Sequence, residues 1–267
     1  MLENKIDEIF NRILNPHPLS YGITKSNVNQ LIADYIAMSE FFPYIQAGAH
    51  NTVVNKCLAK GELIPDSCQA TSVVGAFLSW DEFGGHYKML NGGLPALPTI
   101  LDTSSFHANI LKKDIKQISP ESLNYTYSPV TQDYLKKLQL GLSSEDPVER
   151  VAYMVSFERN AEKMISGLYD SLKILFSLSS QKLAYFEAHV GGDDPAEAYH
   201  IETTTRLIAG VVNDASHSQF LDYFSTACYL NREWTEDIKD IVNTRISTGT
   251  GRSSAGTRSV DLVESSH

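Results

Sequence analysis

The segment 147-PVERVAYMVSFERNAEKMISGLYDSL-172 carries the clearest structural signal in the chain. Apolar side chains recur in it at three- and four-residue steps, which is the spacing of one face of an α-helix. These side chains are Val151, Met154, Val155, Ala161, Ile165 and Leu168. Glu158 stands in the middle of the same stripe. The segment therefore predicts a long core helix with one carboxylate on its buried face.

A carboxylate at position 158 needs an explanation. An ionised carboxyl group in an apolar interior is costly unless it is paired, coordinated or neutralised by a pKa shift. A buried salt bridge from Glu158 to an arginine would satisfy it, and so would a slight rotation of the stripe that exposes it to water. Coordination of a metal ion is the third explanation, and it needs further ligands elsewhere in the chain.

The rest of the chain also has helical patterns. Apolar spacing and capping residues predict helices over 25–48, 68–89, 107–118, 130–141, 147–179, 181–191, 195–212 and 217–244. Alternating runs bounded by hairpin turns, the mark of strands, are nearly absent. We therefore predict an all-α fold, a single bundle of about seven to nine helices over residues 1–245. From Ile246 onward Ser, Thr and Gly dominate, which predicts a disordered tail over 246–267.

Composition narrows the class of protein. The 267 residues are 42% hydrophobic and carry a formal charge of −10, without a basic run that would suit nucleic acid. No stretch of about 18 apolar residues could cross a membrane. The N-terminus has no secretory signal pattern, and three cysteines without a CxxC pair suit a reducing compartment. We therefore expect a soluble, cytoplasmic protein with no nucleic-acid or membrane partner. A bundle of this size often forms a homodimer.

A second group of polar residues continues an apolar stripe. Val74 and Leu78 are followed at four-residue steps by Glu82 and His86. A Glu and a His four apart on one helix lie side by side, so one metal ion could take an oxygen and a nitrogen from adjacent turns. The alternative is an exposed, hydrogen-bonded couple.

A third group lies in 183-LAYFEAHVGGDDPAEAYHIETTTRLI-208. At about 100° per residue, four polar groups of this segment would share one face of a straight helix. They are His189, Asp193, Glu197 and His200. Two glycines and Pro195 interrupt the helix, which leaves open whether Asp193 or Glu197 binds a metal. Glu197 and His200 form the Glu-x-x-His pair of di-metal bundles. Alternatively, Asp193 only caps a helix and Glu197 is solvated.

Three separate helices thus present carboxylates and imidazoles from apolar faces. The set suits two divalent metal ions, with oxygen ligands that offset the charge, imidazoles at the ends and positions left open for O2 or water. Zinc is a poorer choice because no thiolate joins the set. Iron is the expected metal, with a mixed iron and manganese pair as the alternative.

Over residues 25 to 235 this pattern resembles the heme-oxygenase-like di-iron oxidases, the superfamily of the TenA and PqqC proteins and the Chlamydia protein associating with death domains. The family takes a Glu and a His from an early helix, a Glu from a middle helix and a His-x-x-x-Asp-x-x-His series from a late helix. The matching residues here would be Glu82, His86, Glu158, His189 and Asp193.

The chain departs from the family pattern in two places. The early His usually lies further from its Glu, and 106-FHANILKKDI-115 resembles the helix that follows it, so His107 competes with His86. The last His would fall at position 196, which is Ala, so His200 would have to replace it, with Glu197 as a further candidate.

The resemblance implies two iron ions, O2 as co-substrate and oxidation of a small amino-acid-like or fatty-acid-like metabolite. Two other functions fit the same fold. One is a metal-free hydrolase of the TenA type with a cysteine nucleophile, although no cysteine here lies beside a His and an acid in the sequence. The other is a protein-interaction module without activity.

Overall fold

The computed structural model describes residues 2–119, 126–178, 183–190 and 197–249. Within them the chain forms α-helices and short 3-10 helices, and no strand is assigned, which confirms the all-α class. The elements are α1 Leu2–Leu14, η1 Pro18–Ser20, α2 Val28–Gly48, α3 Asn51–Lys60, α4 Asp66–Glu82, α5 Gly85–Gly92, η2 Leu94–Leu101, η3 Thr103–Ser105, α6 His107–Ile118, α7 Pro129–Leu142, α8 Pro147–Phe176, α9 Ala184–Val190, α10 Glu197–Val211, η4 Asp214–Ser216 and α11 His217–Gly249.

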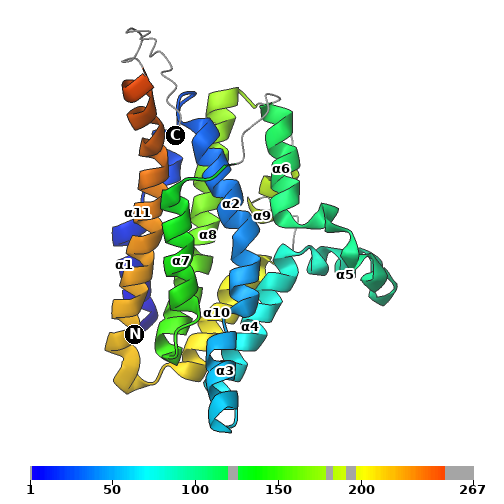
Figure 1. Ribbon diagram of the computed structural model, residues 1–267, viewed down its shortest axis with the longest axis vertical. Coiled ribbons are helices and arrows are strands. Elements are labelled where there is room, and N and C mark those ends of the chain that lie inside the picture. The colour runs from blue at the N-terminus through cyan, green and yellow to red at the C-terminus, as the bar shows by residue number, and fades with distance from the viewer. Residues whose placement is uncertain (1, 120–125, 179–182, 191–196, 250–267) are drawn as a thin grey trace, which may run out of the picture.

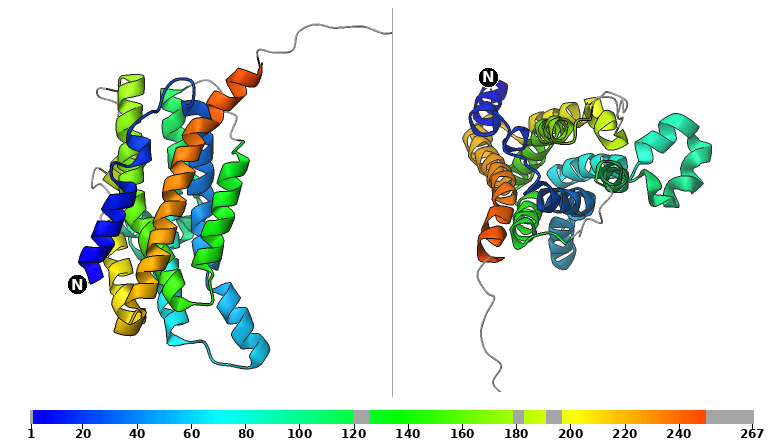
Figure 2. Two further views of the ribbon diagram at one scale, coloured as in Figure 1. Left: turned by 90° about the vertical axis from the view of Figure 1, so that its left-hand side faces the viewer. Right: turned by 90° about the horizontal axis from the view of Figure 1, so that it is seen from above.

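Helix α8 is the centre of the bundle. It packs against α4, α7, α9, α10 and α11, and Figures 1 and 2 show α1, α2, α7, α8 and α11 running side by side along the long axis. Asp146 caps its first turn by accepting a hydrogen bond from the backbone N–H of Val148, and Pro147 occupies the first helical position. Ser177 ends the helix in the left-handed conformation. The long core helix predicted from the sequence is confirmed.

Helices α2 and α4 lie close together, and this contact positions the end of α4. Gly75 faces the backbone of Gln46 so closely that an added Cβ would lie 3.3 Å from its carbonyl oxygen. The Ser79 hydroxyl donates a hydrogen bond to the carbonyl of Pro43, a proline inside α2. This hydrogen bond ties α4 to α2.

The helix predicted over 68–89 is wrong as one continuous element, because it divides into α4 and α5. Gly84 adopts a left-handed conformation with φ of 69°, which is accessible to glycine at little cost. A Cβ at Gly84 would lie 2.4 Å from the carbonyl oxygen of Ser105, and one at Gly85 would lie 2.2 Å from the Trp80 ring. The chain therefore turns here, and α5 with η2 projects sideways from the bundle (Figure 1).

The remaining boundaries agree with the predicted pattern in most places. Helix α6 spans the predicted residues 107–118, and Asp102 caps the short helix η3 that precedes it. Helix α3 was not predicted. Helix α11 continues to Gly249, beyond the predicted boundary at 245, and the rest of the predicted tail, 250–267, lies outside the described residues. No helix among the described residues is both long enough and apolar enough to cross a membrane.

Candidate metal centre

Three side chains from three helices meet near the middle of the bundle. Glu82 ends α4, His107 begins α6 and His189 lies in the last turn of α9. Each offers one ligand atom, and these atoms all lie within 4.8 Å of one another. His107 Nδ1 is 3.4 Å from Glu82 Oε2, and the two imidazole rings are 4.7 Å apart at their centroids. We call these three residues the triad.

The orientation of His189 is held by the backbone. Its Nδ1 lies 2.6 Å from the carbonyl oxygen of Tyr185, one turn earlier in α9, so Nδ1–H donates there and Nε2 carries the lone pair. The Tyr185 hydroxyl in turn shares a buried hydrogen bond of 3.0 Å with Tyr35 from α2. Such support fixes the tautomer and the ring orientation of a metal-binding histidine.

The charge states of the triad suit a divalent cation. Burial, together with the nearby charge of His107, lowers the pKa of His189 to about 4, so its imidazole is neutral at neutral pH. Burial raises the pKa of Glu82, but His107 and His189 together outweigh it and hold that pKa below its ordinary value. Glu82 is therefore an anion. One carboxylate with two imidazoles is the ligand set of many non-heme Fe(II) sites, and catalytic zinc sites use it as well.

A second group of ionisable residues, which we call the Asp81 network, adjoins the triad. Asp81 is fully buried, and its two oxygens lie 2.8 Å from His86 Nδ1 and 2.9 Å from His200 Nε2. The other nitrogen of His200, Nδ1, lies 3.2 Å from Glu158 Oε2. Four side chains from α4, α5, α8 and α10 thus form one chain of contacts, Asp81 at its centre.

Asp81 is a strongly stabilised anion. Burial raises the pKa of its carboxyl group, but the hydrogen bond from His200 and the charges of His200, His107 and His86 together lower it to about 2. His107 belongs to the triad, so the two groups influence each other electrostatically. Since Asp81 and Glu82 are consecutive residues at the end of α4, one helix terminus supplies a carboxylate to each group.

Asp81 was not among the metal ligands predicted from the sequence. Its signal was nonetheless present, because Asp81 lies three residues after Leu78 and seven after Val74, both of them buried on α4. A carboxylate at these steps continues the apolar stripe, as Glu158 does on α8. Glu82 and His86 were predicted to share one helix, and on that prediction the buried face of the helix passes through Glu82 instead of Asp81.

The structure separates the predicted ligands into three sets. Glu82 and His189 lie in the triad, and His107 is their histidine partner, whereas His86 contacts Asp81. Glu158 is buried, with 6% of its surface exposed, and meets His200 in the Asp81 network. Asp193 lies outside the described residues, as does the side chain of Glu197. The metal-binding role of all these residues stays a prediction.

A cavity of about 570 Å³ opens beside the triad, and His107 forms part of its wall. The cavity lies between η3, α6 and α9. Ile110, Ala184 and Ala188 give it apolar surface, and the exposed Lys113 lies at its edge. Its size falls in the usual range of about 300–1,000 Å³ for small-molecule sites.

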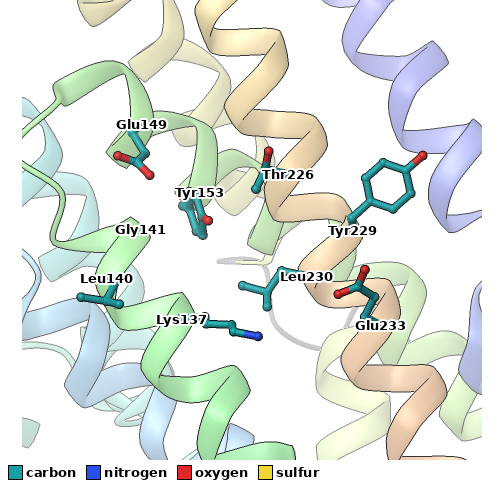
Figure 3. A pocket seen from close by; sticks show the side chains of 9 residues that line it. All are labelled: Lys137, Leu140, Gly141, Glu149, Tyr153, Thr226, Tyr229, Leu230 and Glu233. Atoms are coloured by element: carbon teal, nitrogen blue, oxygen red, sulfur yellow. The ribbon is translucent and has the colours of Figure 1, made fainter.

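Another hollow, of about 660 Å³, lies between α7, α8 and α11. Figure 3 shows its lining, with Lys137, Tyr153 and Glu233 among the side chains around it. The described residues that line this hollow include no member of the triad or of the Asp81 network. It therefore offers no route to the candidate metal centre.

The comparisons with known proteins identify the fold. No protein-family model and no curated protein matches the sequence. The chain is similar to a solved structure from Shewanella denitrificans OS217, a domain of unknown function with a heme oxygenase-like fold. The TM-score is 0.58 and the sequence identity 15%, with 95% of this chain and 97% of the other covered. Such low identity is informative about the fold alone, and it confirms the predicted resemblance at that level. This chain therefore has the heme-oxygenase-like fold.

Proposed function

We propose that this protein is a metal-dependent oxidoreductase that binds two iron ions, or one iron and one manganese, and uses O2 to oxidise a small organic substrate. The observation that carries the proposal is the triad, a carboxylate and two imidazoles within 4.8 Å on a cavity of about 570 Å³. When bound, Fe(II) supplies the electrons for dioxygen reduction, chemistry that side chains alone cannot provide. The chain's own residues hold the ions, keep the ligands in the right charge state and shape the substrate cavity.

The triad would hold the first ion. Its histidines need to be neutral to donate an electron pair to a metal, and the low pKa of His189 meets this condition without displacing a proton. The triad supplies three ligands, of which Glu82 carries one negative charge. A metal ion held by three ligands would keep open positions for water or substrate. The hydrogen bond from His189 to Tyr185 would keep the ring in place when the ion leaves.

The Asp81 network would hold the second ion. Asp81 and Glu158 are both buried, and two buried carboxylates that converge on one histidine need a cation between them. In the metal-free protein His200 lies between the two carboxylates, with one ring nitrogen near each of them. A divalent ion coordinated by the same carboxylates would offset both negative charges. Iron and manganese accept such a mixture of oxygen and nitrogen ligands.

The cavity favours a substrate with an apolar body and a polar end. Ile110, Ala184 and Ala188 would contact an aliphatic chain, while Lys113 at the edge and the acidic Asp114 and Glu187 give the lining charges of both signs. An amino-acid-like or fatty-acid-like metabolite has this chemistry. The alternative of a cysteine hydrolase gains no support, because Cys57, Cys68 and Cys228 are all buried and none lines this cavity.

Metal analysis after anaerobic loading with Fe(II) tests the proposal. We expect two iron ions per wild-type chain, with iron lost from His107→Ala in the triad and from Glu158→Ala in the network. His217→Ala is the matched control, since this exposed histidine contacts only Asp214 among the described acidic groups. Exposure to O2 should then produce a transient visible absorption band. Wild-type protein that binds no iron, or binds zinc alone and consumes no O2, would contradict the proposal.

A further inference from the structure

Two hollows of different size flank the triad on opposite sides of one chain segment. His107 lines the cavity of about 570 Å³ described above, whereas Glu82 lines a separate pocket of about 140 Å³ between α2, the end of α4 and the start of α6. The triad is therefore reached from two directions. The larger hollow approaches it at an imidazole and the smaller one at the carboxylate.

Residues 103–110 form the partition between the hollows. Four of them line the small pocket, namely Thr103, Phe106, Ala108 and Asn109. Four others line the large cavity, namely Ser104, Ser105, His107 and Ile110. The 3-10 turn η3 and the first turn of α6 direct these groups to opposite sides, and no described residue lines both hollows. The two hollows are thus separate openings and do not form one branched cavity.

The small pocket has walls that set its width. The aromatic rings of Tyr44, Phe83 and Phe106 form a continuous row, with centroid distances of 5.1 Å and 5.0 Å. Its outer edge reaches solvent at Tyr44 and at Glu40, whose carboxylate pairs with Lys112 at 3.0 Å. A volume of about 140 Å³ holds a few water molecules, each of which takes about 30 Å³ in the liquid. The larger cavity has about four times this volume, so an extended metabolite fits there and not in the small pocket.

We propose that this pocket is an access port through which molecules the size of water or dioxygen reach the Glu82 side of the metal centre, while the organic substrate uses the larger cavity. The inference rests on the proposed metal-dependent function. Separate access has a physical advantage, because substrate bound at His107 would otherwise block the path of a second reactant. The apolar aromatic row suits neutral dioxygen, and Glu82 at the inner end gives water a hydrogen-bond acceptor.

Thiol labelling of the metal-free protein tests the geometry without any metal. Ala108 lines the port and Ala188 lines the large cavity, and the native cysteines are buried, so Ala108→Cys and Ala188→Cys are a matched pair. Methyl methanethiosulfonate, a small reagent, should modify both variants. Fluorescein maleimide, a bulky one, should modify Ala188→Cys alone. An Ala108→Cys variant that resists the small reagent, or reacts equally with the bulky one, would overturn the port.

Binding of nitric oxide to the Fe(II)-loaded protein, with a saturating fatty acid present to fill the larger cavity, tests the function of the port by stopped-flow absorbance. The larger side chain of Ala108→Leu would fill part of this pocket, so it should slow nitric oxide association about tenfold. Thr103→Leu narrows the exposed edge and keeps the test valid if Ala108→Leu fails to fold. Ala188→Leu should leave the rate of nitric oxide association unchanged while weakening binding of a candidate fatty acid.

The outcomes separate this inference from the function on which it rests. Equal rates for wild type and Ala108→Leu, or a slow rate in Ala188→Leu, would refute the port while the metal centre stands. Wild-type protein that takes up no iron would refute the metal function itself, and the port to that centre would fall with it. In that case the labelling result would show only that a size-selective pocket exists.

Discussion

Replacing Asp81 by asparagine removes the buried negative charge at the centre of its network and leaves the side-chain shape almost unchanged. The pKa of Asp81 is about 2 against an ordinary value of 3.8. At about 1.4 kcal/mol for each pKa unit, the folded protein favours the ionised form by about 2–3 kcal/mol more than the unfolded chain does. Asp81→Asn should therefore lower the unfolding free energy of metal-free protein by about that amount at pH 7.

Urea unfolding followed by circular dichroism measures this difference. Asp133→Asn is the matched control, because Asp133 is exposed and its pair with Lys137, one turn away, is screened by solvent. The sign of the pH dependence follows from the lowered pKa. Ionised Asp81 contributes its full stabilisation above pH 3.8 and loses it as the pH falls towards about 2, so the difference between wild type and Asp81→Asn should shrink as the pH falls below about 4. A loss no larger than that of Asp133→Asn would refute the argument.

Further outcomes are expected at the glycine turn between α4 and α5 and in the triad. Gly84→Ala should cost about 2 kcal/mol or more in thermal unfolding, since a left-handed alanine costs about 1–2 kcal/mol and its Cβ would also meet Ser105. Gly61→Ala has a similar φ of 70° with open space around it, so an equal loss in the two variants would exclude the steric contribution. The imidazole of His189 should stay neutral in NMR titrations until the pH approaches about 4. Because the unfolded chain binds that proton near pH 6.5, this group makes stability fall as the pH drops from 6.5 to about 4. His17, whose pKa burial also lowers to about 4, is the internal control, and zinc or iron that shifts the His17 signals as much as those of His189 would speak against binding at the triad.

Local pattern was sufficient for most of the helices. The stripe around Glu158 predicted both a core helix and a buried carboxylate, and α8 has both. Helical spacing depends only on residues within one or two turns, so the sequence reports it directly. The same helical spacing placed Glu82 and His189 on apolar helix faces, where polar groups need partners.

The choice of partners depended on contacts between distant segments. His86 was the ligand predicted from the sequence and His107 its competitor, and the turn at Gly84 directs His86 to Asp81 while His107 lies beside Glu82. That turn requires glycine at positions 84 and 85, because Ser105 and Trp80 leave no room for a side chain there. Asp81 meets His200, 119 positions later in the chain, through packing of α4 against α10. The sequence by itself therefore determined where most of the helices form and which of their faces carry charge, because periodicity is a local property. Tertiary structure alone decided which charges meet, because the direction of a side chain across a helix break depends on atoms that lie far away in the chain.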